Sequence, residues 1–125
     1  MQRLSKKSRM IKGLDAFTLA YITCALWSST DSNDEPLDKA YGFADLAEST
    51  LQTMIDECRR FQDENGQYFQ DLGQAGHDLW LTRNHHGAGY WDRGYLDGIG
   101  DLLTDRAHAY GSCDLYVGDD GQIYL

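Results

Sequence analysis

The sequence predicts an α+β fold in which three main helices pack on a small three-stranded antiparallel sheet that includes a C-terminal β-hairpin. Three observations lead to this class. Apolar residues recur at helical spacing in three segments, apolar and polar residues alternate in a short segment near residue 80, and a glycine-rich turn separates two β-prone runs at the carboxyl end. Helices that cover one face of an antiparallel sheet form an α+β domain. At 125 residues, of which 42% are hydrophobic, the chain suits one domain with one core.

The charge is unevenly distributed and separates a basic N-terminal arm from an acidic body. The first twelve residues contain five of the eleven basic residues of the chain and none of its twenty acidic residues. Chain termini are commonly poorly ordered unless other elements hold them. We therefore expect a basic flexible arm at residues 1–13 and a single α+β domain at residues 14–125.

The three predicted helices differ in how much of their surface is apolar. Residues 14–26 are apolar on most sides, so this helix should lie at the centre of the core. Residues 51–65 carry one apolar stripe, and Ser49 with Gln52 predicts a capping box at the start of this helix. Residues 99–110 form the third helix, which glycine ends. The residues expected in the core are Leu14, Phe17, Tyr21, Ile22, Ala25, Leu26, Leu51, Met54, Ile55, Cys58, Phe61, Leu102, Leu103 and Ala107.

The predicted strands lie in the second half of the chain. Leu79 and Leu81 alternate with neighbours in a β-prone run, which predicts a strand over residues 77–83. Residues 115–117 and 122–125 flank a Gly-Asp-Asp-Gly turn, a pattern typical of a β-hairpin. Pairing of the hairpin with the earlier strand would complete the three-stranded sheet.

The basic arm and the apolar stretch after it superficially resemble a secretory signal. The sequence Leu26-Trp27-Ser28 lacks the small residues of a cleavage site, and about twelve apolar residues are too few to cross a bilayer core of about 30 Å. Three widely spaced cysteines favour reduced thiols over a disulfide framework. These observations predict a cytoplasmic protein that does not associate with membranes.

Five segments of the chain resemble a family of small acidic phage and prophage proteins. The resemblance implies a viral origin and a setting in the host-cell cytosol, but no particular chemistry, since members of the family have no assigned activity. His85 departs from the glycine expected beside His86. The segments that carry the resemblance are residues 16–22, 78–84, 86–94, 107–111 and 114–125.

Residues 77–94 concentrate polar and aromatic side chains that are typical of functional sites. Arg83 and Arg93 each either pair internally with an aspartate such as Asp78 or Asp92, or recognise an anion between aromatic walls. A small-ligand or hydrolytic pocket is therefore one hypothesis for this protein. Its candidate residues are His77, Arg83, Asn84, His86, Asp92, Arg93 and His108.

The spacing of the possible metal ligands and nucleophiles does not match a known site. The histidines lack the His-x-x-x-His pattern of a zinc helix, and no cysteine pair accompanies them. Cys113 follows His108 closely, but a buried thiol explains it better than a catalytic dyad does. The glycines match no nucleotide-binding fingerprint. The sequence thus predicts no metal and no cofactor, and it favours a binding protein over an enzyme.

The acidic charge supports a second hypothesis, binding to a host protein with a basic surface. A net charge of −9 repels nucleic acids and anionic membranes and attracts basic proteins. Asp97, Asp101 and Asp105 recur at four-residue spacing, so they should follow one helical face, where they either mimic phosphates or are simply solvated. Tyr90 and Trp91 are expected as exposed aromatic anchors beside them. Inhibition of a host nucleic-acid-handling or defence system would follow; the oligomeric state stays open.

Overall fold

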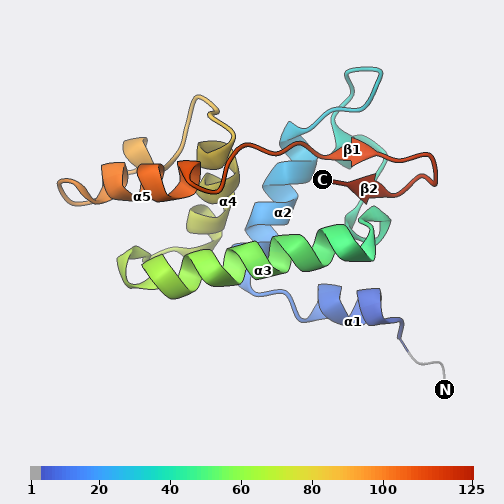
Figure 1. Cartoon of the computed structure of the whole chain (residues 1–125), viewed down its shortest axis with the longest axis horizontal. Helices are drawn as coiled ribbons and strands as arrows, with labels where there is room; N and C mark the ends of the chain where they lie inside the picture. The colour runs from blue at the N-terminus through green and yellow to red at the C-terminus, as the bar shows by residue number, and fades with distance from the viewer. Residues whose placement is uncertain (1–3) are drawn as a thin grey trace.

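The computed structural model describes residues 4–125, which form five α-helices, one short hairpin and several single turns of 3-10 helix (Figure 1). No single helix in this range is long and apolar enough to cross a membrane; α1 and α2 meet the length and composition test only together, with a 110° bend between them. The bounds are α1 Lys6–Lys12, α2 Ala16–Ser28, α3 Glu48–Asn65, α4 Leu72–Arg83, α5 Ile99–His108, β1 Tyr116–Val117 and β2 Ile123–Tyr124.

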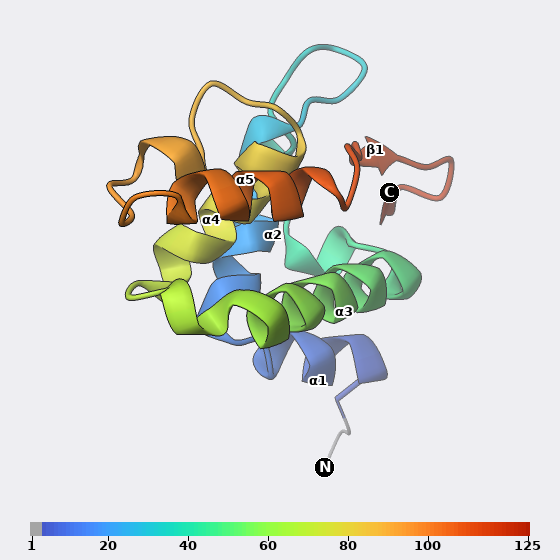
Figure 2. The ribbon, with the colours of Figure 1, turned by 60° about the vertical axis from the view of Figure 1, so that its left-hand side comes forward.

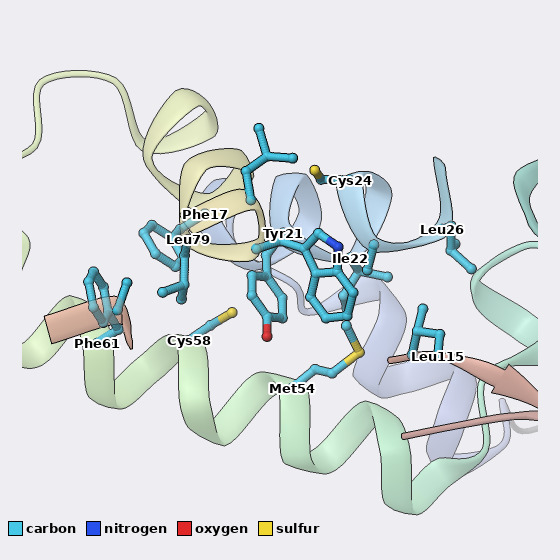
Figure 3. Close-up of a cluster of buried hydrophobic side chains, with 14 of the residues drawn as sticks. Phe17, Tyr21, Ile22, Cys24, Leu26, Met54, Cys58, Phe61, Leu79 and Leu115 are labelled. Carbon is cyan, nitrogen blue, oxygen red and sulfur yellow. The ribbon is translucent and has the colours of Figure 1, made fainter. Parts of the chain in front are cut away.

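Helix α2 occupies the centre of the molecule, as its apolar composition predicts. Asp15 caps its start by accepting a hydrogen bond from the backbone N–H of Thr18 at 2.8 Å. Figure 3 shows Tyr21 of α2 and Cys58 of α3 pointing into the core between their helices. On another side α2 packs against α4, where a Cβ atom on Gly76 would lie 1.9 Å from the carbonyl oxygen of Phe17. Glycine has no Cβ atom, so its presence at position 76 lets the two helices approach closely.

Helix α3 is amphipathic, which confirms the single apolar stripe predicted for it. Leu51, Met54, Cys58 and Phe61 are buried along this stripe. The predicted capping box of Ser49 and Gln52 is wrong, because the helix begins two residues earlier, after Ala47, without a side-chain cap. The backbone N–H of Ala47 instead donates to the carbonyl oxygen of Ile123 at 3.0 Å.

The segment predicted as a strand over residues 77–83 is the second half of helix α4, so this prediction is wrong. Asp71 starts the helix by accepting a hydrogen bond from the backbone N–H of Gln74 at 3.0 Å. Leu79, Trp80 and Leu81 are all buried, because other elements enclose α4 on several sides. A helix enclosed in this way has apolar residues at adjacent positions, and a short window of it can imitate the alternation of a strand.

The predicted C-terminal hairpin is confirmed, but the α+β fold with a three-stranded sheet is not. Strands β1 and β2 pair antiparallel, with Tyr116 opposite Tyr124 and Val117 opposite Ile123. Within residues 4–125 the only addition to this ladder is an isolated parallel bridge between Leu46 and Ile123. The protein is therefore mostly helical with a small hairpin, because the segment expected as the third strand is a helix.

Part of the N-terminal segment assigned to a flexible arm forms helix α1. Ser5 caps this helix by accepting from the backbone N–H of Ser8 at 3.0 Å. The Lys7 ammonium donates to the carbonyl oxygens of Ala44 at 2.6 Å and Leu46 at 3.0 Å. Both ribbon views place α1 alongside α3 (Figures 1 and 2). Residues 1–3 of the predicted arm lie outside the described residues.

Candidate functional site

Arg83, the last residue of α4, lies in the interior with only 3% of its surface exposed. Its Nε donates to the carbonyl oxygen of Gly111 at 2.8 Å, and Nη2 donates to that of Tyr110 at 3.0 Å. Its Nη1 donates to the Tyr21 hydroxyl and to Glu57 Oε2, both at 3.0 Å. Arg83 therefore joins α2, α3, α4 and the chain after α5. The internal-pairing interpretation is right for this residue, although its acidic partner is Glu57.

Arg93 forms the internal ion pair that the sequence offered as an alternative. The Asp78 carboxylate is fully buried, and it accepts from Arg93 Nε at 3.1 and 3.0 Å and from Arg93 Nη2 at 2.9 Å. Gln74 Nε2 donates a further bond to Asp78 at 3.0 Å. Arg93 thus compensates a buried charge and anchors the loop after α4.

Asp92 and Tyr90 also serve the conformation of this loop. Asp92 Oδ1 accepts from the backbone N–H of Gly89 at 3.1 Å and closes a 3-10 turn. The Tyr90 hydroxyl donates to the carbonyl oxygen of Ala75 at 2.6 Å, and its ring stacks on Phe61 with 5.8 Å between centroids. Tyr90 is completely buried, so its prediction as an exposed anchor is wrong. Its neighbour Trp91 is 52% exposed, as expected of an anchor.

The histidine candidates lie in separate places. His77 and Arg93 border an open depression between α2 and α4, to which Leu19 and Thr23 of α2 also contribute. His86 and Asn84 border a different hollow of about 370 Å³, which shares no lining residue with the first. His108, at the end of α5, stacks on His85 with 4.1 Å between ring centroids. The structure therefore does not gather the predicted pocket residues around one cavity.

The hollow beside Asn84 contains the one cysteine that is not fully buried. Asn84 Nδ2 donates to the carbonyl oxygen of Trp80 at 3.0 Å, and Asn84 Oδ1 accepts from the backbone N–H of Cys113 at 2.8 Å. Burial raises the pKa of the Cys113 thiol above its usual range. A nucleophilic cysteine requires the thiolate, which this environment disfavours.

No group of three or more His, Cys, Asp or Glu side chains in residues 4–125 is arranged to hold a metal ion. His85, which departs from the resemblance, has a left-handed backbone with φ of 58°. The ring of His85 stacks on that of His108. The stacking was not visible in the sequence, because it depends on the ends of α4 and α5 meeting in space.

The three aspartates of the predicted acidic stripe are all exposed, but only two of them belong to a helix. Asp97 lies in the turn before α5, which Gly98 closes with φ of 83°, whereas Asp101 and Asp105 lie on α5 itself. The prediction of one helical face for all three is therefore wrong. Within the described part of the chain, none of these carboxylates makes an ion pair or a side-chain hydrogen bond.

Sequence reasoning missed the residues that hold Arg83 in place. Tyr21, Glu57 and Tyr110 lie 62, 26 and 27 positions from Arg83 in the chain. No short motif links them, and a buried arginine cannot be recognised from its neighbours in sequence. Arg83 is the last residue of α4 and precedes the C-cap Asn84. That position suggests that Arg83 binds backbone carbonyl groups only after the segment has been recognised as a helix.

Comparisons with protein-family models, curated proteins and solved structures find no match to this chain. They neither support nor contradict the resemblance to phage proteins. The functional argument therefore depends on the geometry of the chain itself.

Proposed function

We propose that this protein acts by binding a partner protein with a basic surface, through an edge that we name the α5 edge. It consists of Trp91, Leu96, Asp97, Asp101 and Asp105. The observation that carries the proposal is that the three carboxylates of this edge are exposed and have no cationic partner within residues 4–125.

Three other acidic residues, unlike those of the α5 edge, are paired with cations of the fold. Asp78, Glu57 and Glu48 pair with Arg93, Arg83 and Lys6 respectively. Those carboxylates are partly neutralised within the fold, whereas the charges of the α5 edge stay available to attract a partner. Unneutralised surface charge speeds association with an oppositely charged protein and makes that association sensitive to salt.

The α5 edge also offers apolar surface, which charge alone does not supply. Leu96 is 83% exposed and Trp91 is 52% exposed. Trp91 lies beside the first turn of α5, since a Cβ atom on Gly100 would lie 3.6 Å from the Trp91 Cα. Large aromatic side chains such as tryptophan are enriched among the residues that contribute most to binding at protein interfaces. The aspartates would steer the encounter, and Trp91 and Leu96 would anchor the complex.

The chemical class of the partner follows from charge and from the resemblance to phage proteins. A chain with a net charge of −9 repels phosphate backbones, so the partner is a protein and not a nucleic acid. A host protein that itself handles nucleic acid has the required basic surface. We therefore place the interaction in the host cytosol, with inhibition of a nucleic-acid-handling or defence protein as its consequence. A small-ligand pocket is not proposed, because its candidate residues lie apart or are committed to the fold.

Affinity capture with matched variants tests the proposal. Immobilised protein is exposed to bacterial lysate at low and moderate salt, and the retained proteins are identified by mass spectrometry. The variant with Asp97→Asn, Asp101→Asn and Asp105→Asn is expected to lose a basic protein that the wild type retains and that moderate salt releases. The matched control with Asp34→Asn, Asp38→Asn and Asp119→Asn removes the same charge elsewhere on the surface and should keep that protein.

Two results would contradict the proposal. Equal loss in both triple variants would show that only net charge matters, and equal retention in both would show that the α5 edge is not the binding surface. The Trp91→Ala variant should weaken capture by about tenfold or more, which is the effect of truncating a central interface anchor.

A further inference from the structure

A second polar site lies far from the α5 edge, in the groove between α1 and α3. The groove has a volume of about 270 Å³, and Asp15 and Thr18 at the start of α2 also line it. Figures 1 and 2 show α1 running beside α3 at this face, and α5 lies on the other side of α3. We name it the arginine groove, because Arg9 of α1 and Arg59 of α3 both line it.

The two guanidinium groups are available to a ligand. Arg59 is exposed and makes no ion pair or hydrogen bond with the residues from 4 to 125. Arg9 uses one N–H group, which donates to the carbonyl oxygen of Leu4 at 2.8 Å, and its other donors are not engaged within the same range. The other arginines within residues 4–125, Arg60, Arg83, Arg93 and Arg106, each donate a hydrogen bond to another residue.

Within the part of the chain that the structure describes, Asp15 is the one carboxylate that lines the groove, and it forms no ion pair with Arg9 or Arg59. Asp15 Oδ1 accepts from the backbone N–H of Thr18 at 2.8 Å, and Oδ2 accepts from Gln62 Nε2 at 3.1 Å. These bonds tie one oxygen to the start of α2 and the other to Gln62 of α3. Against the opposing effect of burial, these hydrogen bonds and the nearby charge of Arg59 lower the pKa of Asp15, so Asp15 compensates Arg59 in part without a direct ion pair. The nearby α1 residue Lys12 adds a further positive charge outside the lining. The groove is therefore suited to an anion, whereas most of the surface repels anions.

The wall of the groove has an apolar part that an inorganic ion would not use. Met10, Leu14 and Ile55 line it and are half-buried, packed against the core. The volume is slightly below the usual range for small-molecule sites, about 300–1,000 Å³, so a single ring or a short chain is the appropriate size. Arginine presents a planar fork of donors that matches a carboxylate.

We infer that the arginine groove binds a small organic carboxylate. The carboxylate interacts with Arg9 and Arg59, and the apolar part of the ligand lies on Met10, Leu14 and Ile55. This inference is independent of the proposed function, because it involves none of the residues of the α5 edge.

Titration of the full ¹⁵N-labelled chain with benzoate tests the inference by NMR. Saturable shifts are expected at the backbone amides that border the groove, those of Gly13, Leu14, Gln52 and Ile55. Benzyl alcohol, which has the same ring without the charge, should cause no saturable shift at these amides. The Arg59→Gln variant should bind benzoate about tenfold more weakly, the loss expected for a hydrogen bond to a charged group. It should keep the wild-type spectrum elsewhere, since Arg59 makes no ion pair or hydrogen bond within residues 4–125.

A matched control and a second probe make the result decisive. Lys12→Gln removes one positive charge from the same end of the molecule without altering the lining, and it should change the affinity by less than about twofold. An equal loss in Lys12→Gln would overturn the inference, because it would indicate general attraction by the basic helix. Inorganic phosphate that binds as tightly as benzoate would also overturn it, since the apolar wall would then contribute nothing. The absence of saturable shifts with benzoate would refute it directly.

Discussion

Helices α4 and α5 contain similar kinds of residue and use them in opposite ways. Both carry glycine, aspartate, arginine, histidine and leucine, over 12 and 10 residues respectively. Eight residues of α4 are buried, among them Asp78 and Arg83, whereas in α5 only Leu103 and Ala107 are. The charged groups of α4 therefore hold the fold together, while the aspartates of α5 face solvent. The comparison shows that a high density of functional residue types does not indicate a functional site unless the side chains remain accessible.

The largest expected effect is at the glycines of the two helices. Gly76→Ala would place a Cβ atom 1.9 Å from the backbone carbonyl oxygen of Phe17, so α2 and α4 must move apart. We expect a loss of about 3 kcal/mol or more in the free energy of unfolding, measured by urea denaturation followed by circular dichroism. In Gly100→Ala the nearest atom is the Tyr90 carbonyl oxygen at 3.1 Å, and the gain of about 1 kcal/mol in helix propensity should offset much of the strain. Equal losses in both variants would contradict the contrast between a central and a peripheral helix.

The next effect concerns the buried carboxylate of α4. Arg93→Met leaves Asp78, which is fully buried, with Gln74 as its remaining side-chain donor. We expect a loss of about 2–3 kcal/mol, less than for a fully buried pair because Arg93 is partly exposed. Asp78→Asn in the same background should recover part of this loss in a double-mutant cycle. Lys39→Met, which breaks the exposed pair with Glu35, serves as the control and should cost less than about 0.5 kcal/mol.

The effect that is smallest near neutral pH is a loss of stability at alkaline pH, which originates at Cys24 of α2 near the buried Asp78 of α4. Burial raises the pKa of Cys24 from its usual 9.0 to about 12, and the Asp78 carboxylate acts in the same direction. The folded chain therefore keeps a proton that the unfolded chain loses. The contribution of this thiol is complete below about pH 9 and declines as pH rises toward about 12. The free energy of unfolding in urea should fall above about pH 9, and Cys24→Ala should reduce that slope; an unchanged slope would show that Cys24 does not contribute. Tyr21 and Tyr90, whose pKa values burial also raises, contribute a decline in the same direction that persists in the variant.

The sequence pattern was sufficient to predict helix α3 and the C-terminal hairpin, because each has a regular arrangement of buried or turn-forming residues. Helix α3 faces the core on one side only, so its apolar stripe is visible in the sequence. The hairpin is recognisable from the turn that ends at Gly121, with φ of 78°. Helix α4 was assigned incorrectly because it is enclosed on several sides, and burial on several sides removes the helical period from which it would be recognised.

In the candidate site, too, some properties were predictable from the sequence and others were not. The sequence offered internal pairing as an alternative for Arg83 and Arg93, and pairing proved correct for both. It could not show that Tyr90 is buried while Trp91 is exposed, since adjacent positions in a turn are distinguished only by what packs against them.

The sequence by itself determined the central apolar helix, the amphipathic α3, the existence of the helix α5, the hairpin and the uneven distribution of charge, because each depends on residues close together in the chain. Only the tertiary structure decided which charges remain accessible. Arg83 is engaged by residues up to 62 positions away, whereas Arg59 and the aspartates of the α5 edge have no partner within residues 4–125. The physical reason is that burial and pairing are set by which elements meet in space, and the free energy of a charged group depends on those neighbours.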